Sequence, residues 1–220
     1  MKTAGKKIAV LSSGGIDSSI LIQKLLDENK TVYPIYISSG NLWERAEQWW
    51  LRQFLKTRSR DRLKPLVLLS FPMRDVYENS WSVSGKKIPG KKSRDEAVYL
   101  PGKNVILIAK TAIYCMKKNI RQIALAPLKT NPFRDASREF FDQYERALSI
   151  GLGFPIKIRT PFLSKTKKQV MEIGKGFPLE LTFSCLNPRR NLHCGKCNKC
   201  AERKSAFRSV RLPDLTKYDA

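Results

Sequence analysis

The sequence predicts an α/β fold in which helices cover both faces of a doubly wound parallel sheet. Short, β-rich apolar runs alternate along the chain with segments whose apolar residues recur at helical spacing. One of these runs is fully apolar at its centre, which is typical of a buried parallel strand. The 220 residues, of which 42% are hydrophobic and 28% charged, are enough to bury a core without disulfides.

Five runs are predicted as strands, and each is bounded by polar residues, glycine or proline. They are Lys7–Leu11, Val32–Ser38, Leu66–Phe71, Ile120–Ala126 and Ile156–Thr160. Pro34 lies inside the second run and weakens its assignment, because proline removes one donor from a sheet ladder. The third run is the fully apolar one, so we expect it to be buried on both faces.

Five segments between these strands are predicted as helices from apolar residues at steps of three and four. They are Ser18–Asn29, Trp43–Leu55, Lys103–Asn119, Ser137–Gly151 and Lys165–Ile173. Ser164 is the candidate N-cap of the last helix. Trp43, Trp49, Trp50 and Phe54 in the second helix could stack a base, although aromatics at this spacing are more typical of a core.

Two stretches do not fit the alternation. Pro72–Leu100 is long and polar, and loops of that length are usually lids, binding loops or disordered segments. Leu179–Arg211 carries a cysteine cluster followed by a predicted helix, Ala201–Ser209. We therefore expect a main domain over residues 1–178 and a small metal-binding C-terminal region over residues 179–220, packed on it.

The loop after the first strand has the composition of a phosphate-binding site. It lies at the carboxyl end of a strand in a doubly wound sheet, where ligands bind, and it opens a helix whose free N–H groups favour anions. The candidate binding residues are Ser12, Ser13, Gly14, Gly15, Ile16, Asp17, Ser18 and Ser19. Asp17 would repel a bare phosphate, so its presence indicates a bound Mg²⁺ or a helix cap. The alternative is an ordinary Gly-Gly turn followed by a Ser or Asp cap.

Four of the five cysteines, Cys185, Cys194, Cys197 and Cys200, fall within sixteen residues. Four thiolates can close a tetrahedral Zn²⁺ site that is structural, and a [4Fe–4S] cluster is the competing interpretation. His193, the only histidine, could replace one ligand, but four thiols already suffice, so we expect it in solvent or beside the metal ligands. Cys115 stands alone in an apolar helix and is predicted to be a small core residue.

The net charge is the unusual part of the composition. The chain carries 42 Lys plus Arg and 19 Asp plus Glu, a net charge of +23, and such a field attracts polyanions, including nucleic acid. The basic residues cluster in Arg52–Lys64, Lys86–Arg94 and Arg189–Arg211. No apolar run approaches the length of a membrane helix or a signal sequence, so we expect a soluble cytoplasmic protein with no membrane partner.

Three motifs in order resemble a known family. Ser13–Ser18 (SGGIDS) matches the SGGxDS loop of the ATP pyrophosphatases, and Leu100–Asn104 (LPGKN) and the Cys-x8-Cys-x2-Cys-x2-Cys spacing follow it. Together they resemble the 7-cyano-7-deazaguanine synthase family, QueC, from Lys7 to about Arg208. The resemblance implies a Rossmann-like sheet of the adenine-nucleotide alpha-hydrolase type, with ATP, Mg²⁺ and Zn²⁺, a homodimer, and a role in queuosine or archaeosine synthesis.

The resemblance also implies a reaction, that of an ATP-dependent carbon–nitrogen ligase. Members of the family adenylate 7-carboxy-7-deazaguanine, let ammonia displace AMP to give an amide, and then activate the amide oxygen so that it dehydrates to the nitrile. The candidate catalytic residues are Ser13, Asp17, Ser18 and Lys103, and Gly102 and Asn104 join the nucleotide-binding set. Lys103 could instead be a surface lysine, and Asn104 a helix N-cap.

Three features depart from the family pattern. Ile37–Glu44 and Pro127–Asp135 differ from the family segments expected at the substrate, and Asp135 is the only carboxylate in the second of them. The charge also exceeds what a purine-like substrate needs. Two alternatives therefore stay open: an enzyme of the same loop type that adenylates a tRNA base or a protein, and a zinc-ribbon nucleic-acid-binding regulator.

Overall fold

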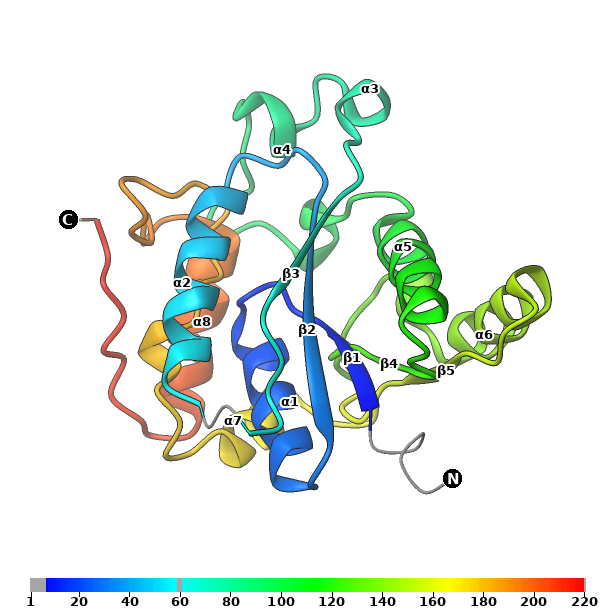
Figure 1. Ribbon diagram of the computed structural model, residues 1–220. Helices are drawn as coiled ribbons and strands as arrows, with labels where there is room; N and C mark the ends of the chain where they lie inside the picture. Colours follow the sequence, from blue (N-terminus) through cyan, green and yellow to red (C-terminus); the bar gives the residue numbers. More distant parts are fainter. Residues whose placement is uncertain (1–6, 59–60, 220) are drawn as a thin grey trace.

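A computed structural model describes residues 7–58 and 61–219, and its centre is a five-stranded, wholly parallel sheet (Figure 1). The strands are β1 (Lys7–Leu11), β2 (Thr31–Ser38), β3 (Val67–Ser70), β4 (Gln122–Ala124) and β5 (Lys157–Arg159). Their order across the sheet is β3-β2-β1-β4-β5. This confirms the predicted α/β fold with a doubly wound sheet.

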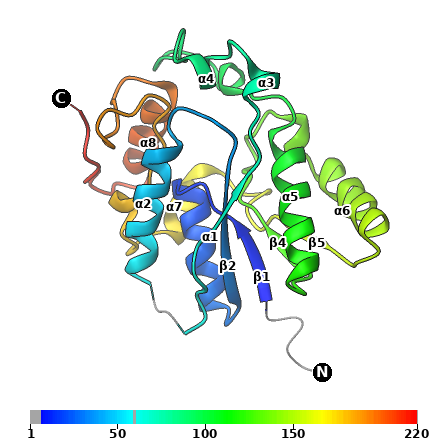
Figure 2. The ribbon, with the colours of Figure 1, turned by 45° about the horizontal axis from the view of Figure 1, so that its top comes forward.

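Helices cover both faces of the sheet, with α5 and α6 on one side and α1, α2, α7 and α8 on the other (Figures 1 and 2). The long helices are α1 (Ile16–Asp27), α2 (Glu44–Lys56), α5 (Lys103–Lys117), α6 (Arg138–Leu152), α7 (Lys167–Ile173) and α8 (Asn198–Ser209). Across residues 7–58 and 61–219, none of the helices is both long and apolar enough to cross a bilayer.

Alternate residues of β1 pack against the two helical layers that cover the sheet. Ala9 packs with Ile108, Ala112 and Phe141 under α5 and α6. Its neighbours Ile8 and Val10 pack on the opposite side, against the apolar residues of α1, α7 and α8. A strand covered on both faces must be apolar throughout, which is why β1 reads as a continuous apolar run.

Two predictions about strands need correction or explanation. β3 is not buried on both faces: it forms the edge of the sheet, and Leu68 is 47% exposed while Val67 and Leu69 pack inward. Composition alone does not separate an apolar edge strand from a central one. Pro34 is tolerated in β2 because its missing donor faces the gap between the bridge at Leu63 and the start of β3.

The predicted cap of α7 is also wrong. Thr166, not Ser164, is the N-cap: its hydroxyl accepts a hydrogen bond from the Gln169 N–H, and the Gln169 side chain accepts one from the Thr166 N–H. This reciprocal pair is a capping box, which satisfies two N–H groups at once and so defines the helix start.

The stretch 72–100 is an ordered cover over the top of the sheet rather than a disordered loop (Figure 2). It contains α3 (Arg74–Tyr77), α4 (Trp81–Ser84) and a 3-10 turn, Asp95–Val98. Its contacts with the C-terminal region are direct, because the Asn198 side chain donates to the Ser93 carbonyl at 2.8 Å.

The C-terminal region shares its apolar contacts with the rest of the molecule. Phe183, Leu186 and the four clustered cysteines pack with Trp43, the N-cap of α2, and with Trp50 of that helix. The division into residues 1–178 and 179–220 stays a prediction, and residues 1–6 and 220 at its outer ends lie outside the described residues.

Candidate active site and four-cysteine centre

A cavity of about 410 Å³ lies at the carboxyl ends of the strands. The strand order reverses there, since the chain runs from β1 outward to β2 and β3 and then returns to β4 on the other side of β1. This is the topological switch point at which doubly wound sheets bind ligands. The loop after β1, the residues that follow β4, the start of α5 and the C-terminal region all contribute to its walls.

Most of the predicted site residues line this cavity. They are Ser12, Ser13, Gly15, Ile16, Asp17, Ser18, Lys103 and Asn104. Ser19 is fully buried behind the loop, and Gly102 is the N-cap of α5 with a φ of 70°. Gly14 faces α2 instead, with a φ of 77°.

The loop after β1 is held by bonds within itself and by the C-terminal region. The Ser18 hydroxyl donates to the Gly15 carbonyl at 3.1 Å and lies 3.3 Å from the Ser13 hydroxyl. The Phe183 N–H donates to the Gly14 carbonyl at 2.7 Å. The amides that follow Gly15 open α1 without a side-chain cap, so they remain free to bind an anion.

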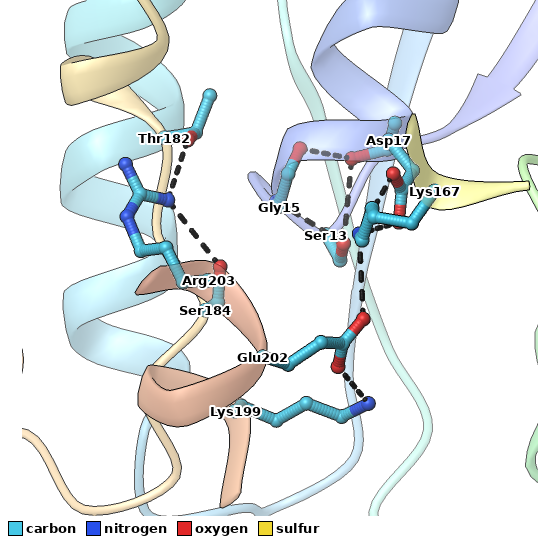
Figure 3. A network of polar contacts seen from close by, with 10 residues as sticks. Ser13, Gly15, Asp17, Lys167, Thr182, Ser184, Lys199, Glu202 and Arg203 are labelled. Atoms are coloured by element: carbon cyan, nitrogen blue, oxygen red, sulfur yellow. Dashed lines mark hydrogen bonds and ion pairs between the residues drawn. The ribbon is translucent and has the colours of Figure 1, made fainter. Parts of the chain in front are cut away.

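Asp17 makes an ion pair across the cavity (Figure 3). Its two carboxylate oxygens accept from Lys167 Nζ at 2.9 and 2.7 Å, and Lys167 also lies 3.4 Å from a Glu202 oxygen. Glu202 in turn pairs with Lys199 at 2.6 Å. Burial alone would lower the pKa of Lys167, but the two carboxylates raise it above its ordinary value. Asp17 therefore already binds a cation, which is the property that a Mg²⁺ ligand needs.

Lys103 and Asn104 enter the cavity from the first turn of α5. Lys103 Nζ lies 5.5 Å from the centre of the Trp43 ring, so it is a cavity residue and not a free surface lysine. The Asn104 backbone N–H donates to the Asp135 carboxylate, and its side-chain amide donates to the Asp135 carbonyl, both at 3.0 Å. The alternative of Asn104 as N-cap is wrong, because Gly102 holds that position.

Sequence reasoning missed a further carboxyl in the cavity, that of Glu47. Tyr36 donates its hydroxyl to Glu47 at 2.8 Å, and burial raises the pKa of Glu47 to about 7. Glu44 also lies at the cavity wall, but its carboxylate is engaged by nearby backbone: one oxygen accepts hydrogen bonds from the N–H groups of Ser39 and Asn41. The amphipathic pattern of α2 carries no sign that these two acids face inward.

Lys167 and Glu202 were missed as well, although weak signals exist for both. Lys167 is the first residue of α7, just beyond β5, and Glu202 follows the metal-ligand candidate Cys200 by two positions. Their partners are 150 and 35 residues away in the sequence, so no local pattern brings them together.

Two aromatic pairs flank the cavity. Trp43 and Trp81 stack with ring centres 5.3 Å apart, and the ring centres of Tyr99 and Phe133 lie 4.9 Å apart. Trp43 and Trp50 are buried as expected for core residues, whereas Trp49 is 43% exposed.

The four clustered cysteines converge. Their sulfur atoms all lie within 4.8 Å of one another, and all four residues are buried. Thiolates about 2.3 Å from one tetrahedral ion lie about 3.8 Å apart, close to the 3.9 Å between Cys185 and Cys197 and the 4.0 Å between Cys194 and Cys200. Backbone N–H groups of Leu186, Asn187 and Cys194 point at the sulfurs, which favours the thiolate form.

His193 and Cys115 lie where a supporting role would place them. His193 is fully buried, not in solvent; its Nε2 accepts from the Ser184 N–H at 3.2 Å, and burial lowers its pKa to about 3. Cys115 is buried in α5, where desolvation raises its pKa to about 12, which confirms it as a core residue.

Comparison with known proteins decides the family. The model of the family described as queuosine biosynthesis protein QueC matches residues 7–211, nearly the whole chain. The chain belongs to the QueC family. This confirms the resemblance drawn from the loop, the Leu100–Asn104 segment and the cysteine spacing.

Curated relatives named 7-cyano-7-deazaguanine synthase match over nearly their full length. The chain is 26% identical over 226 residues to a 7-cyano-7-deazaguanine synthase of Methanothermobacter thermautotrophicus, covering 97% of this chain and 99% of the relative. It is 29% identical over 206 residues to 7-cyano-7-deazaguanine synthase 1 of Desulfitobacterium hafniense, with 91% of each chain covered.

Among solved structures, a predicted tRNA methyltransferase subunit of Methanocaldococcus jannaschii superposes with a TM-score of 0.50 at 16% identity, covering 76% of this chain and 73% of that one. That match shows the fold alone.

Proposed function

We propose that this QueC protein is an ATP-dependent carbon–nitrogen ligase that converts 7-carboxy-7-deazaguanine to 7-cyano-7-deazaguanine. One observation carries the proposal: a single cavity brings the Ser13–Ser18 loop together with Lys103 and with the carboxyls of Asp135 and Glu47. Phosphate-binding groups and carboxyl groups suited to a guanine-like edge line the same cavity.

The phosphates of ATP are assigned to the loop and its cations. The free amides at the start of α1, the hydroxyls of Ser13 and Ser18, and the Lys103 ammonium would stabilise the charge that develops when the substrate carboxylate attacks the α-phosphorus. A Mg²⁺ ion bound by Asp17 and the phosphates would supply further charge neutralisation. With no nucleophile–base pair in this set, catalysis would rest on positioning and charge.

The heterocycle is assigned to the space between the two aromatic pairs. A planar bicycle stacks well on such rings, and the N1–H and N2–H₂ edge of a guanine needs acceptors. Asp135 and Glu47, which line the same cavity, would supply the carboxyl oxygens. Glu47 lies outside the two altered segments, so it offers a second carboxyl beside Asp135, the only one in the Pro127–Asp135 stretch.

Ammonia is the second substrate of the proposed reaction. It displaces AMP from the acyl-adenylate, forming the amide carbon–nitrogen bond as the acyl–oxygen bond breaks. A second adenylation, on the amide oxygen, turns that oxygen into a leaving group, and loss of AMP and two protons gives the nitrile.

The test is pyrophosphate release from ATP and Mg²⁺ with ammonium, with and without 7-carboxy-7-deazaguanine, followed by mass spectrometry of the product. Carboxylate-dependent nitrile is the expected product. The Asp135→Asn variant should raise the KM for the carboxylate while ATP binding stays unchanged, and Glu139→Gln, at an exposed position of α6, serves as its control. Absence of stimulation in protein that binds ATP would contradict the proposal.

We also propose that the four cysteines hold zinc. Their sulfurs surround a space for one ion, whereas a four-iron cluster places each thiolate on a separate iron and so spreads them farther apart. Such a centre would hold residues 179–220 in a fixed structure against the main domain. Metal analysis of aerobically purified protein should give one zinc per chain, and a brown protein with iron and sulfide would contradict the assignment.

The basic surface is proposed to bind tRNA. Exposed basic residues of one loop lie beside those of the cysteine region, since the Asn198 N–H donates to the Pro89 carbonyl at 2.9 Å. They are Lys86, Lys87, Lys91, Lys92, Arg94, Arg189, Arg190 and Lys196. Binding of tRNA that weakens steeply with salt is expected, and no binding near physiological ionic strength would contradict it.

A homodimer is also proposed, from family membership, and light scattering would measure the mass of the protein in solution.

A further inference from the structure

Helix α8 carries groups that face two different centres. It begins after Cys197 and includes Cys200, both from the four-cysteine centre. Glu202 and Arg203, which follow Cys200 by two and three positions, line the cavity. Consecutive residues of a helix point about 100° apart. One turn of α8 can therefore bind a metal on one side and face the nucleotide loop on the other.

The first connection between the two centres is a row of alternating charges (Figure 3). Asp17 pairs with Lys167, Lys167 with Glu202, and Glu202 with Lys199, at 2.7, 3.4 and 2.6 Å. The side chains are only 21–33% exposed. Because shielded charges are costly when unpaired, the position of Lys167, and through it of Asp17, depends on Glu202.

The second connection runs through the backbone. The Phe183 N–H donates to the Gly14 carbonyl at 2.7 Å, and Cys185, another cysteine of the centre, follows two residues later. Arg203, the neighbour of Glu202 on α8, fastens that helix to the second connection, since its guanidinium donates to Thr182 at 2.8 Å and to Ser184 at 3.4 Å. Arg203 is 1% exposed, so these bonds are part of the interior.

We propose that metal binding at the four cysteines and nucleotide binding at the Ser13–Ser18 loop strengthen each other, with Glu202 as the positioning residue that joins them. The inference rests on the proposed zinc centre and nucleotide site. In it the metal does more than fold the C-terminal region: by fixing the start of α8, it places Glu202 against Lys167. Coupling between binding sites is reciprocal, so the same factor must appear in both affinities.

The test uses the zinc-loaded, full-length protein and measures zinc release to a colorimetric chelator, with and without a non-hydrolysable ATP analogue and Mg²⁺. Nucleotide binding is measured separately by calorimetry. We expect bound nucleotide to lower the amount of zinc released at equilibrium, by an amount that corresponds to zinc binding at least about fivefold tighter, the lower end of typical coupling. Glu202→Gln should keep one zinc per chain and bind nucleotide more weakly, and nucleotide should no longer protect its zinc.

The matched control is Glu172→Gln, which removes a carboxylate from a surface ion pair with Lys175 and should leave the protection intact. The coupling would be overturned if nucleotide still protected the zinc fully in Glu202→Gln. It would also be overturned if nucleotide bound the unmodified protein without changing zinc release. Either result would leave the proposed reaction unaffected. Absence of nucleotide binding in calorimetry would overturn both.

Discussion

Gly14 is the residue of the loop whose backbone leaves least room for change. Its φ of 77° lies in the left-handed region, and a Cβ there would lie 3.1 Å from the Glu47 carbonyl oxygen and 3.2 Å from Leu51 Cβ. The loop after β1 therefore approaches α2 as closely as it does only because this position carries no side chain.

Replacing Gly14 by Ala should destabilise the protein by about 2 kcal/mol or more, because backbone strain and a steric clash add. Gly176→Ala is the control: its φ is 83°, but nothing lies within 4 Å of its added Cβ, so only the strain of about 1 kcal/mol applies. Urea denaturation of both variants measures the difference. Equal losses of stability in the two variants would show that the close packing of α2 against Gly14 adds nothing to the cost of the substitution.

Glu47 gives the cavity a carboxyl that titrates near neutrality. Because burial raises its folded-state pKa to about 7 from the ordinary 4.5, the folded protein binds a proton more tightly than the unfolded chain. Stability from this group is thus fully present below about pH 4.5 and is lost as the pH rises through about 7.

Glu47→Gln removes this dependence. The variant should gain stability relative to the unmodified protein as the pH rises from 5 to 8, by an amount on the order of 2 kcal/mol, since one pKa unit corresponds to about 1.4 kcal/mol. Thermal unfolding of both proteins across this range measures the gain. A constant difference between them would contradict a raised pKa at Glu47.

At the scale of elements, the alternation of strands and helices was predictable because each strand is short, apolar and followed by a polar turn. β1 was predicted with its observed bounds. The edge position of β3 and the cap of α7 were not predictable from the same pattern. Edge position depends on strand order, and capping depends on which of two nearby hydroxyls, Ser164 or Thr166, meets the Gln169 N–H.

The capping box makes a prediction that separates these two hydroxyls. Thr166→Ala should cost about 1 kcal/mol, since it removes the bond that satisfies the first turn of α7. Ser164→Ala, at an exposed position, should change stability by less than about 0.5 kcal/mol. Because Lys167 begins α7, Thr166→Ala should also weaken nucleotide binding, which calorimetry would detect. The reverse order of stability losses would restore Ser164 as the cap.

At the scale of the whole molecule, the motifs located the site but not its full charge balance. The loop and the cysteines are each local in sequence, so their spacing reveals their chemistry. Lys167, Glu202 and Glu47 reach the cavity from three separate helices, and only the packing of α7, α8 and α2 brings them there. Contacts between residues so far apart leave no periodic pattern in one sequence. The pyrophosphate-loop motif was therefore predictable, and the pairing of its Asp17 with Lys167 was not.

The net charge of +23 makes a last prediction for the whole molecule. Like charges repel within the compact state, and salt screens them over about 8 Å at physiological ionic strength. Raising NaCl from about 50 to 300 mM should therefore raise the Tm by about 2–4 °C, the shift that about 1 kcal/mol produces in a chain of this size. The exposed loop residues Lys86, Lys87 and Lys91 contribute to that repulsion, so replacing all three by Glu should reduce the salt response. If the response came from anions filling the cavity, the triple variant would keep it in full, and scanning calorimetry of the two proteins distinguishes these outcomes.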